Sequence, residues 1–185
     1  MKYAFDMNMK KICVFCGSSG GKDKKYLDLA KRVGEVITQK NFGLVYGGGN
    51  VGLMGMVAHT VLKNNKEVIG VIPKSLTNRE MADFSITQLH IVETMHERKK
   101  MMYDLSDAFL VIPGGMGTLD EMFEILTWAQ LKFHNKPVYI LNEFGFYTDL
   151  IKFVNHSSEQ GFIKKEHLQL FQVIEKAEDL LKIDI

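Results

Sequence analysis

Short apolar runs alternate with longer amphipathic segments along most of the chain. Seven runs have the length of strands, and their Val, Ile and Leu content is typical of strands buried on both faces. These runs cover residues 11–16, 42–46, 67–72, 88–93, 108–112, 137–141 and 171–175. The segments between them have helical periodicity. They cover residues 23–40, 52–65, 94–106, 118–132, 147–159 and 176–182. The alternation predicts an α/β fold, in which helices flank a mainly parallel sheet of about seven strands with doubly wound, Rossmann-like connectivity.

Length and charge balance narrow the choices further. The chain has 185 residues, enough for one domain with a full core. We expect this domain to span residues 11–185, after a polar extension over residues 1–10 that lacks the apolar segment of a signal peptide. Lys and Arg number 23 against 22 Asp and Glu, so no overall field favours nucleic acid or an anionic membrane. No apolar run approaches the roughly 18 residues of a membrane span. A small anionic ligand fits this balance, because local geometry binds it.

The two cysteines are expected to be structural. Cys13 and Cys16 form a C-x-x-C inside the first predicted strand, where residues three apart point to opposite faces. They should therefore neither share a metal nor form a disulfide, and a reducing, cytoplasmic setting fits them. The six histidines show no H-E-x-x-H motif or Cys/His cluster, so we expect no metal site.

Four segments that follow predicted strands carry the candidate chemistry. In doubly wound sheets, ligands bind beyond the carboxyl ends of the strands, where the strand order reverses. The segments are "GSSGGK" (17–22), "GGGNVGLMG" (47–55), "TMHERKKM" (94–101) and "PGGMGTLDE" (113–121). Glycine-rich turns before helices expose backbone amides that bind phosphate, and these segments should share one rim. We therefore predict a phosphorylated ligand, with tight turns that bind nothing as the alternative.

Two common nucleotide signatures are not satisfied. Gly47, Gly49 and Gly52 match G-x-G-x-x-G, but the next strand ends "VIGVIP", without the acidic residue that holds the ribose of a dinucleotide. The chain contains no G-x-x-x-x-G-K-[ST] motif, which argues against Walker-type nucleotide hydrolysis. The serines of "CGSSG" do not form the nucleophile elbow of a serine hydrolase.

The stretch "PGGMGTLDE" has two interpretations. "TLDE" matches a capping box, with Thr118 at the N-cap and Glu121 reaching back to its amide. Alternatively, the glycines form a phosphate cradle beside a catalytic carboxylate. On the helical wheel Glu121 projects between Ile125 and Trp128, away from the polar side. A carboxylate placed there must pair with a cation or have a raised pKa.

Arg98 is the cation that we expect beside Glu121. It falls within an apolar arc of its predicted helix, where a guanidinium is costly unless it is paired or faces a ligand. The alternatives are a side chain that extends to solvent, or an ion pair with Asp104 or Asp107. The segment 73–87 has no regular pattern and the length of a lid or binding loop.

Apolar residues cover most of the circumference of the helix predicted over 118–132. Such a helix should be buried on more than one side, by the sheet and by a partner subunit. We therefore expect a homodimer that associates through residues 118–131.

Taken together, "CVFCGSS", "LVYGGGNVGLMG", "MHERKKMM", "PGGMGTLDE" and "WAQL" closely resemble the Lonely Guy family of cytokinin riboside 5′-monophosphate phosphoribohydrolases. The resemblance runs from about Lys11 to the C-terminus. Many relatives carry the older label lysine decarboxylase, although nothing in this chain indicates a pyridoxal phosphate site. The resemblance implies a dimeric hydrolase without cofactor. It would cleave the N-glycosidic bond of an adenine-type nucleoside 5′-monophosphate, plain or N6-prenylated, to free base and ribose 5-phosphate.

The resemblance also implies roles for individual residues. Arg98 and Glu121 match the catalytic pair. The phosphate cradle would consist of Gly114, Gly115, Gly117 and Thr118. The rest of the pocket would be lined by Ser18, Ser19, Gly47, Gly48, Gly49, Met95 and Lys99. The dipeptide "LD" at 119–120 departs mildly from the family pattern. The alternative is a non-catalytic carrier of a nucleotide or of molybdenum cofactor on the same fold, which would not require Arg98 together with Glu121.

Overall fold

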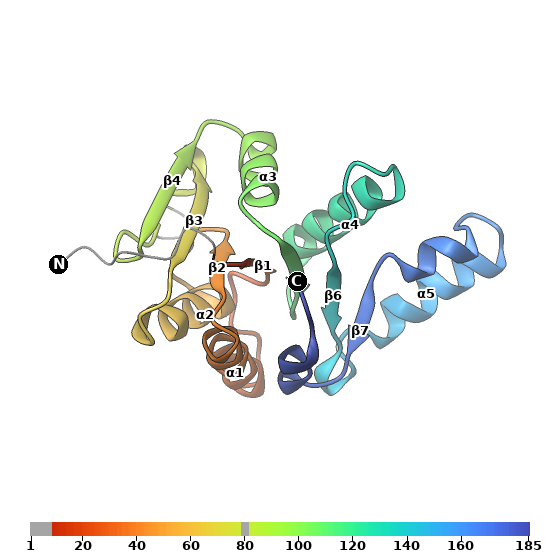
Figure 1. The fold of residues 1–185 in the computed structure, drawn as a ribbon, viewed down its shortest axis with the longest axis horizontal. Helices are drawn as coiled ribbons and strands as arrows, with labels where there is room; N and C mark the ends of the chain where they lie inside the picture. The colour runs from red at the N-terminus through yellow and green to blue at the C-terminus, as the bar shows by residue number, and fades with distance from the viewer. Residues whose placement is uncertain (1–8, 79–81) are drawn as a thin grey trace.

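The computed structural model describes residues 9–78 and 82–185, which form one sheet with helices on both faces (Figure 1). Residues 1–8 of the predicted N-terminal extension lie outside the described residues. Within the described ranges the sheet has seven strands, all parallel, in the order β4-β3-β2-β1-β5-β6-β7. The strands are β1 (Lys11–Phe15), β2 (Gly43–Tyr46), β3 (Val68–Pro73), β4 (Gln88–Val92), β5 (Ala108–Val111), β6 (Val138–Leu141) and β7 (Gln172–Ile174). The predicted doubly wound α/β fold is confirmed.

The strand order reverses once, between β1 and β5. The chain builds outward from β1 to β4, then returns so that β5 pairs with the free side of β1. From there it builds outward again to β7 at the opposite edge. The crevice at this reversal is the usual ligand site of such sheets. It lies between the loops that follow β1 and β5.

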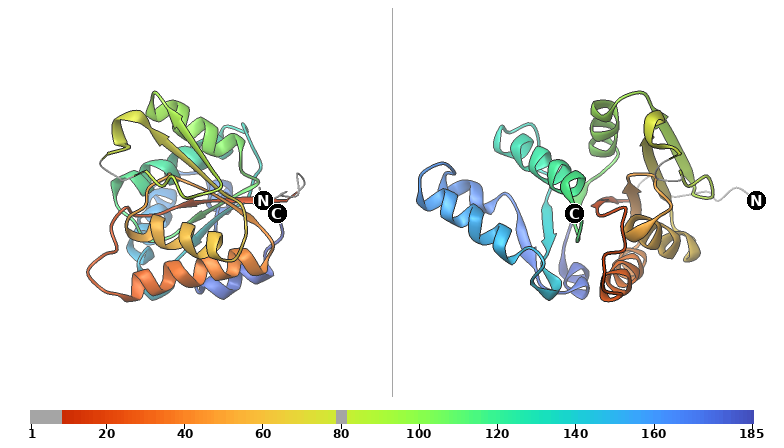
Figure 2. Two further views of the ribbon diagram at one scale, coloured as in Figure 1. Left: turned by 90° about the vertical axis from the view of Figure 1, so that its left-hand side faces the viewer. Right: turned by 180° about the vertical axis from the view of Figure 1, so that it is seen from behind.

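The helices divide between the two faces of the sheet (Figures 1 and 2). Helices α1 (Lys25–Gln39) and α2 (Gly52–Lys63) pack on one face together with the C-terminal 3₁₀ helix η4 (Ala177–Lys182). The other face is covered by α3 (Met95–Asp104), α4 (Met116–Gln130) and α5 (Thr148–Glu159). Shorter 3₁₀ turns are η1 (Lys74–Leu76), η2 (Glu143–Gly145) and η3 (Lys165–Gln169). The helix predicted over residues 176–182 differs in type, since residues 177–182 form a 3₁₀ helix.

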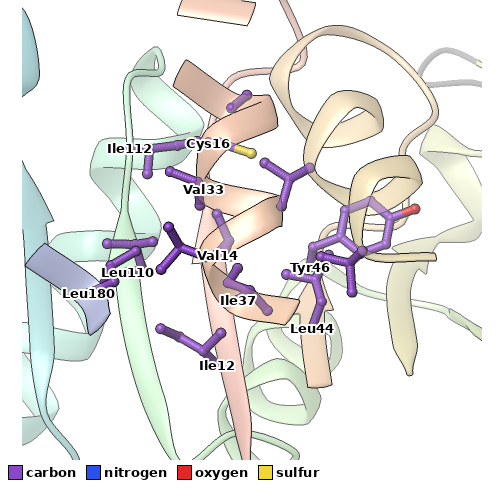
Figure 3. Packing of buried hydrophobic residues seen from close by; sticks show 14 of the residues in the cluster. Ile12, Val14, Cys16, Val33, Ile37, Leu44, Tyr46, Leu110, Ile112 and Leu180 are labelled. Carbon is purple, nitrogen blue, oxygen red and sulfur yellow. The ribbon is translucent and has the colours of Figure 1, made fainter. Parts of the chain in front are cut away.

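Strand β1 lies at the centre of the core and supplies both faces. Ile12, Val14 and Cys16 point toward α1, where they meet Val33 and Ile37 (Figure 3). Cys13 and Phe15 point to the opposite face and join the cluster under α3 and α4. Both cysteines are buried and neither forms a disulfide, and burial raises the pKa of the Cys13 thiol. The prediction that the cysteines lie on opposite faces is confirmed.

Within the described ranges, no helix has the length and apolar character that a membrane crossing requires.

Candidate active site at the β1–β5 crevice

A cavity of about 220 Å³ opens at the carboxyl ends of the central strands. The loops after β1 and β5 and the helices α2, α3 and α4 form its walls. The lining residues are Cys16, Gly17, Ser18, Met54, Met95, Arg98, Gly115, Met116, Gly117, Thr118 and Glu121. All four segments singled out in the sequence thus reach one rim, as predicted.

Arg98 and Glu121 form a buried ion pair in the wall of this cavity. Helix α3 begins after Thr94, whose Oγ1 accepts a hydrogen bond from the Glu97 amide and caps the helix. One turn later the Arg98 side chain turns inward. Its Nη2 lies 3.5 Å from Oε1 of Glu121, and the residues are only 6% and 8% exposed. The predicted pairing is confirmed.

The alternative prediction, an ion pair of Arg98 with Asp104 or Asp107, is wrong. Asp104 pairs with Lys100 at 2.6 Å, and Asp107 pairs with Lys10 at 3.0 Å. Asp104 is the last residue of α3 and Asp107 immediately precedes β5, so both lie toward the rim of the sheet opposite to the cavity. Arg98 therefore directs its charge toward the cavity and Glu121.

Backbone acceptors fix the plane of the guanidinium. Nε donates to the Val71 carbonyl at 3.2 Å, and Nη2 donates to the Gly47 carbonyl at 3.5 Å. Nη1 lies 3.9 Å from the Met95 sulfur. A methyl group added at Gly47 would overlap Nη2, so the guanidinium rests directly on that glycine. A buried cation needs such acceptors to offset its loss of hydration.

The capping box predicted for α4 is wrong. The N-cap is Gly115 and the helix begins at Met116, so Thr118 is its third residue and Glu121 lies a turn further in. The Leu119 amide donates to the Gly115 carbonyl at 3.1 Å, which closes the first turn. The Thr118 side chain instead packs back against Gly114, where a methyl group would overlap Oγ1.

The early start of α4 exposes donors to the cavity. In the described part of the chain, the amides of Met116, Gly117 and Thr118 have no protein acceptor. These residues line the cavity, and the positive end of the helix dipole lies there. Ideal Cβ atoms at Gly115 and Gly117 would meet nothing within 4 Å. The N-terminus of α4 can therefore receive an anion at close range.

The N-terminus of α2, by contrast, is already occupied by the protein. The Gly17 carbonyl accepts hydrogen bonds from the amides of Leu53 at 3.1 Å and Met54 at 3.3 Å. The Gly17 amide donates to the Pro113 carbonyl at 3.1 Å, so this residue joins the loops after β1, β2 and β5. Gly52 has a φ of +60°, and a methyl group there would overlap the Ser18 backbone. Only one of the two glycine-rich helix starts is open to a ligand.

The remaining predicted site residues are placed as follows. Ser18 and Met95 line the cavity, whereas Ser19 and Gly114 line a neighbouring cavity of about 160 Å³ that shares Gly17 and Gly115 with it. Lys99 does not line either cavity and turns toward α4, where it pairs with Glu124 at 3.0 Å and Asp120 at 3.2 Å. The glycine loop does not line either cavity within the part of the chain that the structure describes. This loop consists of Gly47, Gly48 and Gly49.

Sequence reasoning missed three apolar residues of the wall, Cys16, Met54 and Met116. Met54 and Met116 line the cavity together with Met95, which was predicted. Met54 and Met116 each follow a glycine-rich turn at the start of a helix. That position in the sequence could have indicated that they line the site. Within the described residues no group of three His, Cys, Asp or Glu side chains could hold a metal ion. The site therefore offers an arginine, a carboxylate, helix amides and thioethers.

Solved structures share this fold at low sequence identity. The molybdenum cofactor binding protein of Rippkaea orientalis superposes with a TM-score of 0.70 at 22% identity, over 96% of each chain. The molybdenum cofactor carrier protein of Chlamydomonas reinhardtii gives a TM-score of 0.68 at 19% identity, over 94% of each chain. These similarities establish the fold alone.

Sequence relatives are much closer. A family model described as "possible lysine decarboxylase" matches residues 54–183. The cytokinin riboside 5′-monophosphate phosphoribohydrolases LOG1 and LOG4 of Arabidopsis thaliana are 43% and 45% identical to this chain. These matches cover 96% and 93% of the chain and 83% and 80% of the relatives. The rice enzyme LOG (Oryza sativa subsp. japonica) is 45% identical over 85% of this chain and 65% of its own length. The chain therefore belongs to the Lonely Guy (LOG) family.

Proposed function

We propose that the protein hydrolyses the N-glycosidic bond of adenine-type nucleoside 5′-monophosphates and releases the free base and ribose 5-phosphate. The observation that carries this proposal is the buried pair of Arg98 and Glu121 beside the open N-terminus of α4. The names of the relatives point to the same reaction, because they are phosphoribohydrolases that act on a riboside 5′-monophosphate.

The geometry of α4 suits the two ends of a ribose phosphate. The phosphate would bind the amides of Met116, Gly117 and Thr118, with the Ser18 hydroxyl on the opposite side. Glu121 lies three residues further along the helix, which is about 4.5 Å at the helical rise. A ribose anchored by its 5′-phosphate would thus present C1′ near the carboxylate. Binding energy from the phosphate would hold the reacting carbon in place.

The chemistry follows from the charges at that point. As the bond between C1′ and the base nitrogen breaks, its electron pair leaves with the base and C1′ gains oxocarbenium character. The Glu121 carboxylate stabilises that cation, or orients the ribose hydroxyls and the attacking water. Water adds its oxygen to C1′ and loses a proton, while the departing base takes one up. Arg98 holds Glu121 in position and favours the electron-rich base electrostatically.

The base would lie against Met54, Met95 and Met116, whose thioethers suit a flat aromatic ring. Incubation with AMP and with N6-isopentenyl-AMP, followed by chromatography of free base and ribose 5-phosphate, tests the proposal. We expect release from at least one nucleotide. If both nucleotides bind and neither releases base, the protein is not a phosphoribohydrolase.

A carrier of molybdenum cofactor is the other function considered from the sequence. A carrier would use the anion site of α4 but would not need Arg98 together with Glu121 in the wall. The similarity to cofactor carriers is one of fold, at 22% identity or less, whereas the relatives at 43–45% identity are named as enzymes. The hydrolase is therefore the function that we propose.

We also propose that two copies associate through α4, and that the protein works in the cytoplasm, where cysteines that form no disulfide stay reduced. Phe123 of α4 and Phe153 of α5 are 40% and 63% exposed. Between these helices and the segment 163–171 lies an apolar groove of about 200 Å³. Exposed apolar surface of this kind marks protein interfaces.

A further inference from the structure

The glycine loop on which Arg98 rests has no side chains of its own to hold it. Gly47 accepts a hydrogen bond from Nη2 of Arg98 and lies directly against the guanidinium. Gly48 has a φ of +77°, and Gly49 follows before α2 begins. Successive glycines lose more conformational freedom on folding than other residues. Contacts from outside the loop must therefore fix its conformation.

The segment that follows β3 supplies these contacts. The Asp83 amide donates to the Gly48 carbonyl at 3.0 Å, and Ala82 pairs with Gly49 in an isolated antiparallel bridge. Residues 82–83 thus contact the loop at Gly48 and Gly49, while Arg98 contacts it at Gly47.

The Asp83 carboxylate fixes this support. It is 2% exposed, and its Oδ1 accepts hydrogen bonds from the Ser85 amide at 3.0 Å and the Ser85 hydroxyl at 2.5 Å. Its Oδ2 lies 2.9 Å from Nε2 of His59, on α2. One oxygen therefore shapes the turn at 83–85, and the other ties that turn to α2. A carboxylate is costly to bury, and all these partners are needed to offset the cost.

We propose that Asp83 is a positioning residue for Arg98. The contacts run from the Asp83 carboxylate to the turn at 83–85, from the Asp83 amide to Gly48, and from Gly47 to the guanidinium. Without the carboxylate, the glycine loop gains freedom and the guanidinium loses its fixed plane beside Glu121. The consequence for catalysis rests on the proposed hydrolase function, whereas the effect on Arg98 rests on the geometry alone.

A spectroscopic experiment tests the positioning directly. The chain contains three arginines, Arg32, Arg79 and Arg98, so ¹⁵N-arginine labelling gives a simple NMR spectrum. The Nε–H signal of Arg98, which donates to Val71, is identified by its loss in Arg98→Lys. We expect Asp83→Ala to move this signal and to speed its exchange with water.

The matched control is Glu67→Ala. Glu67 is also a buried carboxylate, 6% exposed, with a bond from Gln88 at 3.2 Å and an ion pair with Lys11 at 3.5 Å. It lies just before β3, at the rim of the sheet opposite to the cavity. The control should lose stability but leave the Arg98 signal in place.

Kinetics on the nucleotide that turns over supply the second readout. Asp83→Ala should lower kcat by about tenfold or more, since small displacements of a catalytic group are costly. KM should change by less than about threefold, because the α4 amides that hold the phosphate are untouched. Asp83→Asn keeps an oxygen for Ser85 and should recover part of kcat. Glu67→Ala should keep the wild-type kcat.

The outcomes separate the alternatives. If Asp83→Ala folds, leaves the Arg98 signal unmoved and lowers kcat no more than Glu67→Ala does, Asp83 only stabilises the fold and the proposal is overturned. If Asp83→Ala does not fold, Asp83→Asn is judged by the same two readouts. If the wild-type protein hydrolyses neither nucleotide but the Arg98 signal still depends on Asp83, the positioning stands and the proposed function fails.

Discussion

At the scale of single residues, the pair of Arg98 and Glu121 is the feature that most needs explanation. A buried ion pair contributes little net stability compared with apolar side chains of the same volume, because both charges lose hydration. Its location in the wall of a cavity, beside helix amides that point into it, supports the catalytic role proposed above. The sequence predicted this pair from one argument, that an arginine within an apolar arc requires a partner. It could not predict that Gly47 and Val71 would hold the guanidinium, since those contacts depend on tertiary packing.

Replacement of Glu121 by Gln should therefore separate chemistry from folding. Gln keeps the volume and one hydrogen-bonding oxygen but removes the charge, so turnover should fall about 100-fold or more. The variant should still fold but melt at a lower temperature, because Arg98 loses its carboxylate partner and keeps the carbonyls of Val71 and Gly47. The control is Glu124→Gln, which changes a carboxylate of the same helix that pairs with Lys99 outside the cavity. Near wild-type release of base by Glu121→Gln would remove the carboxylate from the mechanism.

His134 should make the stability depend on pH. Its Nδ1 accepts from the Lys136 amide at 3.1 Å and its Nε2 lies 3.0 Å from the Ile125 carbonyl, an arrangement that suits the neutral ring. Burial lowers its pKa below the usual 6.5. As pH falls below about 6.5, the unfolded chain takes up a proton that the folded state resists, so stability falls until the folded pKa is passed. Between about pH 7.5 and 5.5, one unit either side of the ordinary histidine pKa, His134→Gln should flatten the dependence of the unfolding free energy on pH. An unchanged slope would contradict the assignment.

At the scale of elements, local pattern predicts existence and type better than exact ends. The seven strands fall within about two residues of their predicted positions because period and composition define them. The sequence predicts that α4 begins at residue 118, because Thr118 matches the pattern of an N-cap residue. In the structure Gly115 is the N-cap and the helix begins at Met116. The sequence also did not predict that the loop at 47–49 supports Arg98. A glycine can make room for a ligand or for a neighbouring side chain, and the sequence does not distinguish Arg98 from a phosphate.

Gly117 has open space at its Cβ position and Gly47 does not, so substitution of the two glycines should affect different kinetic constants. Gly117 lies in the first turn of α4 with open space at its Cβ position, so Gly117→Ala should stabilise the fold, by up to about 0.5–1 kcal/mol. If a phosphate binds there, the same methyl group should raise KM. Gly47→Ala should instead lower kcat, because its methyl group would overlap the guanidinium of Arg98. Thermal melts and steady-state kinetics measure both. An unchanged KM in Gly117→Ala would place the phosphate elsewhere.

At the scale of the whole molecule, alternation of elements predicts a parallel sheet but not the order of its strands. That order depends on which strand pairs with β1 after β4, and only tertiary contacts decide it. The cavity lies where the order reverses, so its exact position likewise followed from the topology. The apolar circumference of α4 predicted a partner subunit, and Phe123 and Phe153 leave apolar surface exposed on this side of the molecule.

The double variant Phe123→Glu/Phe153→Glu should therefore reduce self-association. Two carboxylates on the exposed apolar surface of α4 and α5 would lose hydration in an interface, which is costly. Light scattering coupled to size-exclusion chromatography should show a dimer for the wild type and a shift toward monomer for the variant. Phe84→Glu is the control, because Phe84 is 75% exposed in a different part of the chain. Equal masses for the wild type and the double variant would exclude this interface.

Gly17 has a consequence for how the pocket forms. Through its amide and its carbonyl this residue joins Pro113 to Leu53 and Met54, so the loops after β1 and β5 and the start of α2 meet at one residue. The cavity exists only when β1 has paired with both β2 and β5. A bound nucleotide should therefore protect against global unfolding and slow hydrogen exchange throughout the central strands, because no partly folded chain retains the site. Ligand binding should thus report on the completed fold.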